Sequence, residues 1–204
     1  MAAETAGPPV SRRDELLELA AAMFAERGLR ATTVRDIADS AGILSGSLYH
    51  HFTSKEQMVE EVLRNFLDWL FERYAEIVAR ESDPLERVKG LFMTSFEAIE
   101  DRHAQVVIYQ DEAKRLSSLP QFEFVDARNR EQRRMWVDVL KQGVAEGSFR
   151  PDIDVDLVYR FIRDTTWVSV RWYQPGGPLT AEQVGQQYLS IVLGGITKEG
   201  APNG

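Results

Sequence analysis

The chain has 204 residues, 44% of them hydrophobic and 27% charged, which is typical of a globular protein. It has no cysteine, which excludes disulfide bonds and thiolate metal sites and fits a reducing cytoplasm. The net charge of -8 disfavours a protein whose whole surface binds nucleic acid. We find no signal peptide and no apolar run of roughly 18 residues, so the sequence predicts a cytoplasmic protein without a membrane partner.

The acidic charge is unevenly distributed. Residues 1–55 carry six Lys or Arg against seven Asp or Glu, whereas the remaining residues carry 18 against 25. A DNA-binding segment in the first quarter would therefore rely on a small local basic surface.

Apolar residues recur at helical spacing three times in the first quarter of the chain, and this predicts three helices. Gly28 is expected to end the first helix, and Thr32 or Thr33 to cap the second. Residues 1–11 are predicted to form a flexible tail. The helices are expected at about residues 12–27, 33–41 and 45–51, so residues 12–55 form one small domain.

Six longer helices are predicted in the rest of the chain, which makes the protein all-α with about nine helices. Ser54 with Gln57, and Thr180 with Gln183, match the capping-box pattern at the start of two of them. The eighth helix is expected to run from Val155 to Tyr173. Residues 56–198 would thus form a second, larger helical domain.

The segment 32–56 has the spacing of a helix-turn-helix, with Gly42 in the turn between two short helices. A recognition helix places its N-terminal residues against the bases, and small residues there permit close approach. The hydroxyls, imidazoles and ammonium that follow are suited to phosphate contacts. The candidate DNA-binding residues are Thr33, Ser45, Gly46, Ser47, Tyr49, His50, His51 and Lys55.

Two alternatives to this interpretation remain open. Tyr49 and His51 could simply pack beneath the following helix. The whole segment could also be a helical bundle that binds no DNA.

The same segment resembles the TetR family of bacterial repressors. The resemblance implies a homodimer that binds a palindromic operator and a C-terminal domain that binds an inducer and dimerises. Leu44 stands where a capping Ser is usual, so we expect the cap to move to Ser45, which itself stands where Lys is frequent. The matching residues are Phe24, Gly28, Thr32, Thr33, Ile37, Ala38, Ala41, Gly42, Leu48, Tyr49, His51, Phe52, Lys55 and Glu56.

Arg163, Trp167 and Arg171 are spaced i, i+4, i+8 and would share one face of the predicted eighth helix. Guanidiniums can bind phosphate and an indole can stack on a nucleobase, so these three are the candidate ligand-binding residues. Their spacing fits equally well salt bridges at a dimer interface with Trp167 as a buried anchor. The residues that fall on another face and are predicted to lie in the core are Phe161, Val168 and Trp172.

The ninth helix is predicted to contribute an apolar face to the dimer. In the family that the chain resembles, the last two helices usually form the dimer interface. The candidate dimer contacts on the ninth helix are Val184, Tyr188, Ile191 and Val192.

Longer segments, including VDLVYRFIRDTTWVSVRWYQPGGPLTAEQVGQQY, resemble a group of actinobacterial TetR-type repressors of steroid catabolism. This resemblance implies an inducer that is a CoA thioester of a cholesterol ring-degradation intermediate, an indane-dione propionate. An alternative is a repressor that responds to a fatty acyl-CoA or a drug-like hydrophobic ligand. Candidate lining residues for an apolar cavity are Phe92, Phe96, Val107, Ile108, Tyr109, Met135 and Trp136.

Sequence motifs of enzymes are missing: we find no phosphate-binding glycine loop, nucleophile elbow or zinc-binding His-Glu pattern. We therefore expect no catalytic residue, no metal site and no cofactor other than the inducer.

Overall fold

The structure is a computed structural model that describes residues 11–116 and 119–197. Every regular element among these residues is a helix, which confirms the all-α prediction; one isolated antiparallel bridge joins Phe149 to Thr197. The predicted flexible tail lies outside the described residues except for Ser11. The α-helices are α1 (Arg12–Arg27), α2 (Val34–Ser40), α3 (Ser45–Tyr49), α4 (Lys55–Arg80), α5 (Pro84–Asp101), α6 (His103–Leu116), α7 (Glu123–Glu146), α8 (Val155–Val168) and α9 (Ala181–Ile196).

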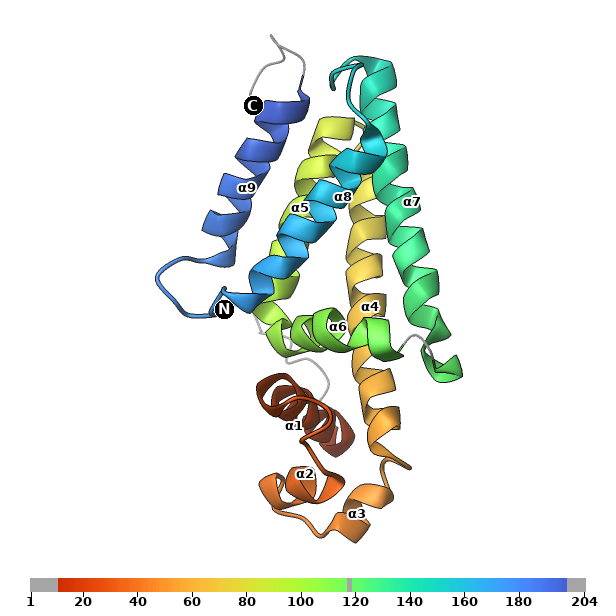
Figure 1. Cartoon of the computed structure of the whole chain (residues 1–204), viewed down its shortest axis with the longest axis vertical. Coiled ribbons are helices and arrows are strands. Elements are labelled where there is room, and N and C mark those ends of the chain that lie inside the picture. Colours follow the sequence, from red (N-terminus) through yellow and green to blue (C-terminus); the bar gives the residue numbers. More distant parts are fainter. Residues whose placement is uncertain (1–10, 117–118, 198–204) are drawn as a thin grey trace, which may run out of the picture.

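Helices α1 to α3 form a small unit at one end of the molecule (Figure 1). Ser11 caps α1 in a capping box with Asp14, and Gly28, at a φ of 83° that suits glycine, ends the helix. The side chains of Ile37 and Leu48 are almost completely buried and hold α2 and α3 together. The end of α1 at Gly28 and the cap of α2 at Thr33 are as predicted, whereas the cap at Ser11 was not predicted.

The larger helical bundle is built around α5, which packs against α4, α7 and α9 (Figure 1). Helix α4 runs from the small unit into this bundle, so the domain boundary expected at residue 55 falls on a continuous helix. Helix α6 lies across the bundle's lower end, against α1. The effector bundle, residues 81–197 together with the second half of α4, is thus joined to the small unit through α4 and α6.

Two local predictions were wrong. Helix α8 ends at Val168 and continues only as a 3₁₀ turn, Ser169–Arg171, because the Ser169 hydroxyl donates to the Thr166 carbonyl and the chain tightens there. Leu44, not Ser45, is the N-cap of α3, without a side-chain hydrogen bond.

The Ser54–Gln57 capping box is only half formed. Ser54 accepts from the Gln57 amide, but the Gln57 side chain accepts from the backbone N–H and the hydroxyl of Thr53 instead of the cap residue. The box at Thr180 and Gln183 is complete, as predicted.

Candidate functional site

The exposed side of the helix-turn-helix carries most of the predicted DNA-binding residues. Tyr49 is 55% exposed, and Gly46, Ser47, His50 and His51 are also exposed. Neither Tyr49 nor His51 packs beneath α4, which removes that alternative for both. Ser45 is half-buried at the start of α3. Gly42, at a φ of 69°, makes the turn between α2 and α3.

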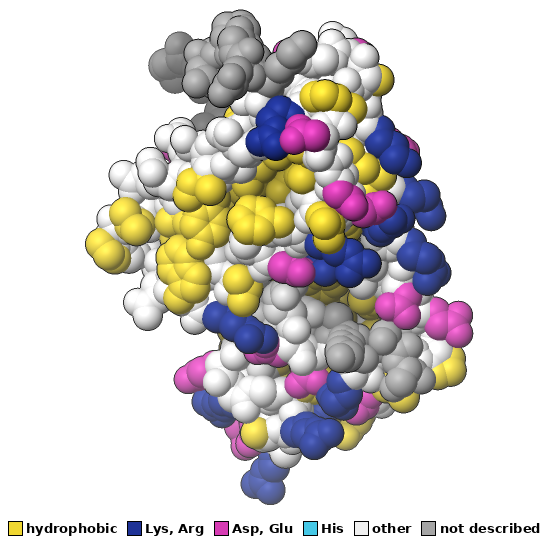
Figure 2. Space-filling view, turned by 45° about the horizontal axis from the view of Figure 1, so that its top comes forward, with side chains coloured by type: hydrophobic (Ala, Val, Ile, Leu, Met, Phe, Trp, Pro, Cys, Tyr) yellow, Lys and Arg dark blue, Asp and Glu magenta, His cyan; other side chains and the backbone are white. Residues whose placement is uncertain are grey.

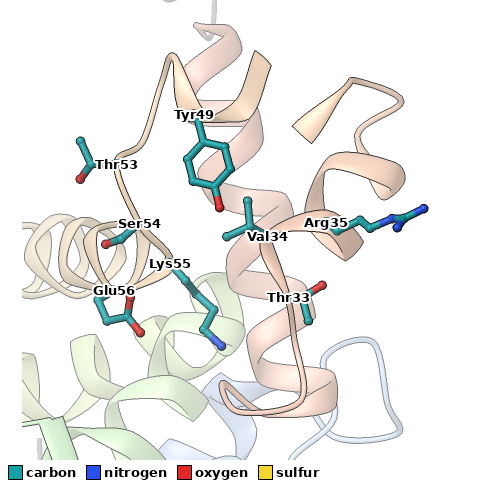
Figure 3. A pocket seen from close by; sticks show the side chains of 8 residues that line it. All are labelled: Thr33, Val34, Arg35, Tyr49, Thr53, Ser54, Lys55 and Glu56. Carbon is teal, nitrogen blue, oxygen red and sulfur yellow. The ribbon is translucent and has the colours of Figure 1, made fainter. Parts of the chain in front are cut away.

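A pocket of about 480 Å³ lies where the N-termini of α2 and α4 approach each other (Figure 3). The Tyr49 ring points into it from α3, with its hydroxyl toward Val34, and Arg35 points outward from its rim. Hydroxyls, two cationic side chains and two helix N-termini around one hollow form a surface suited to a phosphate group. The residues that line it are Thr33, Val34, Arg35, Tyr49, Thr53, Ser54, Lys55 and Glu56.

Lys55 and Thr33 have structural partners in addition to any DNA contact. The Lys55 ammonium donates to the carbonyls of Leu29 and Thr32 at 2.7 and 2.8 Å, and so holds the loop between α1 and α2. The Thr33 hydroxyl donates to the Asp36 carboxylate and accepts from the Asp36 amide. Hydrogen bonds from Thr33 lower the pKa of Asp36, so this cap persists at neutral pH. A phosphate contact by either residue stays a prediction.

Arg35 is a candidate phosphate contact that sequence reasoning missed. Its side chain is 82% exposed and only loosely paired with Asp39, at 3.7 Å. Its position two residues after the Thr33 cap could have revealed it in the sequence, because a cation there lies beside a helix N-terminus, and helix N-termini favour phosphate.

The three candidate ligand-binding residues do not form one exposed face. Trp167 is only 3% exposed, whereas the side chains of Arg163 and Arg171 are 41% and 64% exposed. Arg171 lies in the 3₁₀ turn that follows α8, so the i, i+4, i+8 geometry fails after Val168. The prediction of a continuous Arg–Trp–Arg surface was therefore wrong.

Trp167 lies at the centre of an aromatic cluster drawn from three helices. Its ring meets Phe66 of α4 edge-on at 6.4 Å and Tyr109 of α6 edge-on at 6.2 Å, measured between centroids. Edge-to-face contacts of this kind stabilise a core beyond the area they bury. The indole thus joins α8 to α4 and α6.

The two arginines each have one exposed carboxylate partner. Arg163 donates to Asp164 at 2.7 Å, and its guanidinium lies 5.7 Å from the centroid of the Tyr159 ring. Arg171 donates to Asp111 of α6 at 3.4 Å. Exposed pairs contribute little stability, so an anionic ligand could replace either carboxylate at small cost.

Several polar groups are buried within the same bundle. The Tyr109 hydroxyl donates to Asn129, and burial raises the pKa of Tyr109, so this hydroxyl remains protonated. Burial likewise raises the pKa of Tyr74 to about 12; its hydroxyl shares a 2.6 Å hydrogen bond with Ser95. The Thr166 hydroxyl is buried without a partner among the described residues. Such a group destabilises the fold unless something pairs with it.

The residues predicted to line an apolar cavity mostly belong to the core. Phe92, Phe96, Ile108, Tyr109 and Trp136 are buried. The other two, Val107 and Met135, are partly buried and pack against the core. Contact of any of them with a ligand stays a prediction.

The comparisons with known proteins identify the family. Residues 16–62 match the family described as bacterial regulatory proteins, tetR family, and residues 81–196 match the tetracyclin repressor-like C-terminal domain. The chain belongs to the TetR family.

Similar TetR-family proteins include two curated repressors and a solved structure. The chain is 79% identical over 198 residues to the HTH-type transcriptional repressor KstR2 of Mycolicibacterium smegmatis, with 97% of each chain covered. It is 60% identical to KstR2 of Rhodococcus jostii, over 91% of each. The solved structure of the ketosteroid transcriptional regulator KstR2 of Mycobacterium tuberculosis superposes with a TM-score of 0.92 at 77% identity, covering 96% of this chain and 100% of that one.

The protein is thus a TetR-type transcriptional repressor with a DNA-binding helix-turn-helix and not an enzyme. Within the described residues, no three side chains of His, Cys, Asp or Glu are grouped as a metal site would require. None of the helices described is long and apolar enough to cross a membrane.

In this TetR-type repressor an apolar stripe lies on the outside of α8 and of the residues that follow the 3₁₀ turn. Phe161, Val168 and Trp172 are between 43% and 53% exposed, so their placement in the core was wrong. The core-facing stripe is instead formed by Tyr159, Ile162, Thr166, Trp167 and Val170. Helix α8 therefore has apolar residues on two sides, only one of which the protomer buries.

Helix α9 adds Ile191, which is 66% exposed, to this stripe. Val184 and Val192 are buried within the protomer. Of the four predicted dimer contacts, only the half-buried Tyr188 and the exposed Ile191 therefore have surface with which to contact a second protomer. Figure 2 shows hydrophobic side chains gathered on the face of α8 and α9. A groove of about 160 Å³ in this face is lined by Phe161, Thr165, Val168, Tyr188, Ile191 and Val192.

Substitutions of Arg35 and Lys55 distinguish a residue that contacts phosphate from a residue that stabilises the fold. We expect Arg35→Met to weaken DNA binding on all sequences and reduce the salt slope by about 1, because one phosphate contact is lost. Lys55→Met should lower the free energy of unfolding by about 1–3 kcal/mol, because two backbone carbonyls lose their charged donor. Gel shifts at several salt concentrations and urea unfolding measure the two effects.

Arg80→Met is the matched control, since Arg80 has the same charge but lies at the far end of α4 and is 72% exposed. An unchanged salt slope for Arg35→Met would contradict the assignment of Arg35. An unchanged free energy of unfolding in Lys55→Met would contradict the structural role of Lys55.

Proposed function

We propose that this repressor binds a palindromic operator as a homodimer and releases it when a CoA thioester of a steroid ring-degradation intermediate binds. The observation that carries the ligand part is Arg163, half-buried on the same helix as the buried Trp167 and the unpartnered Thr166 hydroxyl. A ligand with an anionic part and an apolar, oxygen-bearing part suits this combination. The names of the similar repressors, one of them a ketosteroid regulator, favour a steroid-derived acyl group.

The two ends of such a ligand would use different residues. CoA phosphates would take the place of Asp164 on Arg163, and of Asp111 on Arg171, in charge-assisted hydrogen bonds. Fused apolar rings would be accommodated near the aromatic cluster of Trp167, where a ring carbonyl could accept a hydrogen bond from Thr166. This would satisfy a hydroxyl that has no partner among the residues that the structure describes.

A fatty acyl-CoA or a drug-like hydrophobic ligand is the alternative. A fatty acyl-CoA would use the same arginines but would not need the Thr166 hydroxyl. A neutral drug would need neither arginine. Titrations with CoA, a fatty acyl-CoA and the indane-dione propionyl thioester, read by thermal shift, separate these ligands because each stabilises the protein according to its affinity.

The homodimer is supported by the outward apolar stripe of α8 and α9. Monomeric proteins rarely expose contiguous apolar patches beyond a few hundred Å². A two-fold axis through this face would pair the stripe with its own copy, and twofold dimers are the commonest oligomers. Such a dimer would present two recognition helices to two operator half-sites.

Arg163→Met tests the ligand site. We expect the Kd for the steroid-derived thioester to rise roughly tenfold to a hundredfold, because a charge-assisted hydrogen bond contributes about 1.5–3 kcal/mol. Operator affinity should be retained. Calorimetry and gel shifts measure the two quantities.

Arg160→Met is the matched control, because Arg160 is an exposed arginine on the same helix. If Arg163 belonged to the dimer interface, Arg163→Met would give monomers with weak operator binding before any thioester is added. That result, read by sedimentation, would contradict the ligand role.

A further inference from the structure

At the boundary between the small DNA-reading unit and the effector bundle, a buried amide is hydrogen-bonded to a carboxylate at the surface of α1. Gln105 of α6 is only 7% exposed, and its amide Nε2 donates to Oε2 of Glu18 on α1 at 3.0 Å. A buried amide without a partner destabilises the fold, and a bond to a carboxylate is stronger than one between neutral groups. The contact therefore favours the arrangement of α1 on α6 in which Glu18 lies opposite Gln105.

The same helix, α6, is attached to the C-terminal end of α8. Tyr109 lies one helical turn after Gln105, and its ring packs edge-on against Trp167. Asp111 follows and pairs with Arg171. A displacement near Trp167 can thus reach Glu18 through one continuous helix of 14 residues.

The small unit is also held by α4, which would act as its second attachment. Arg13 of α1 forms an ion pair with Glu61 of α4 at 2.5 Å and lies 4.6 Å from the centroid of the Phe52 ring. Since α4 continues into the effector bundle, a rotation of the unit about α4 would change the packing of α1 on α6, which includes the Gln105–Glu18 hydrogen bond.

We propose that the Gln105–Glu18 hydrogen bond is a positioning contact that sets the angle of the DNA-reading unit on α6, and that an inducer alters operator affinity through it. Only the inducer step rests on the proposed function. The angle matters because a dimeric helix-turn-helix protein must match two half-sites at a fixed separation.

The first test uses a palindromic DNA fragment selected by the wild-type protein from a random library. Gln105→Leu and Glu18→Ala should each weaken binding to it by about fivefold or more, and the double variant should be no weaker than the singles. Glu18→Gln keeps an acceptor oxygen and should bind within about twofold of wild type. Unchanged single variants, or effects that add, would overturn the positioning contact.

Glu26→Ala is the matched control for charge, because Glu26 lies on the same helix with its side chain 73% exposed. It should leave operator affinity within about twofold of wild type. An equal loss in this control would show that the charge of α1, and not the contact with α6, determines affinity, and it would also overturn the proposal.

The second test adds the steroid-derived CoA thioester. Gln105→Leu should bind the thioester within about twofold of wild type, yet the ratio of operator Kd values with and without it should fall by about fivefold or more. If the ratio of operator Kd values in Gln105→Leu equals that of the wild type, the inducer does not act through this contact and that part of the proposal is overturned. A wild-type protein that ignores every CoA thioester would refute the proposed inducer instead, while the operator measurements would still decide the positioning contact.

Discussion

Replacing Ile191 or Phe161 with aspartate is expected to convert the repressor into a monomer with at least a hundredfold weaker operator binding. Both side chains are more than half exposed in the protomer, so the fold should tolerate the change. In the proposed dimer each carboxylate would be buried against apolar groups without a partner, and the twofold axis introduces it twice. An uncompensated buried charge costs about 3–5 kcal/mol, which corresponds to a hundredfold or more in affinity.

Sedimentation at micromolar concentration and gel shifts on a palindromic fragment measure these two effects. Ser190→Asp is the matched control: it adds the same charge at an exposed position one residue earlier on α9. It should remain a dimer, since Ser190 does not line the groove between α8 and α9. A dimer that persists in both Ile191→Asp and Phe161→Asp would remove this face as the interface.

The sequence predicted the helix-turn-helix well because its signals are local. The cap at Thr33 and the glycines at positions 28 and 42 depend on neighbours within a few residues. Family resemblance over the same segment pointed to the same structure.

The effector bundle was harder because helical spacing reveals faces but not which face is inside. Phe161 and Trp167 were correctly separated onto different sides of α8, but the protomer exposes Phe161, which was predicted to lie in the core, and buries Trp167, for which spacing left both possibilities open. A helix with apolar residues on two sides requires two partners, and only the tertiary structure shows which one lies within the protomer. The early end of α8 at Val168 depends on Ser169, a local hydrogen bond that periodicity does not reveal.

Partners distant in sequence account for the remaining differences at the candidate sites. Lys55 has the charge and position of a phosphate contact, but the carbonyls that hold it belong to residues more than twenty positions earlier. Gln105 has no motif around it, and only the contact with Glu18 reveals it. Long-range contacts of this kind cannot be deduced from the spacing of residues in one sequence.

Trp167→Ala is expected to lower the free energy of unfolding by about 3–5 kcal/mol, the usual loss when a large buried aromatic side chain is removed. The indole is almost completely buried and meets the rings of Phe66 and Tyr109 edge-on, so its loss leaves a cavity between three helices. Because this loss is a large part of the stability of an ordinary domain, the variant is unsuitable as a test of ligand binding. Trp167→Phe keeps an aromatic ring and should unfold closer to wild type.

Urea unfolding of Trp167→Ala, with Trp69→Ala as the control, measures this effect. Trp69 of α4 is only partly buried, with the guanidinium carbons of Arg73 and Arg102 at 5.8 and 5.3 Å from its ring centroid. Its removal should cost about 1–2 kcal/mol, because a partly exposed ring leaves no closed cavity and exposed cation–π contacts are weak. Equal losses in the two variants would contradict a central packing role for Trp167. If Trp167→Phe is as stable as expected but binds the thioester poorly, the indole has a role in recognition separate from its role in the core, since packing alone would leave the thioester Kd unchanged.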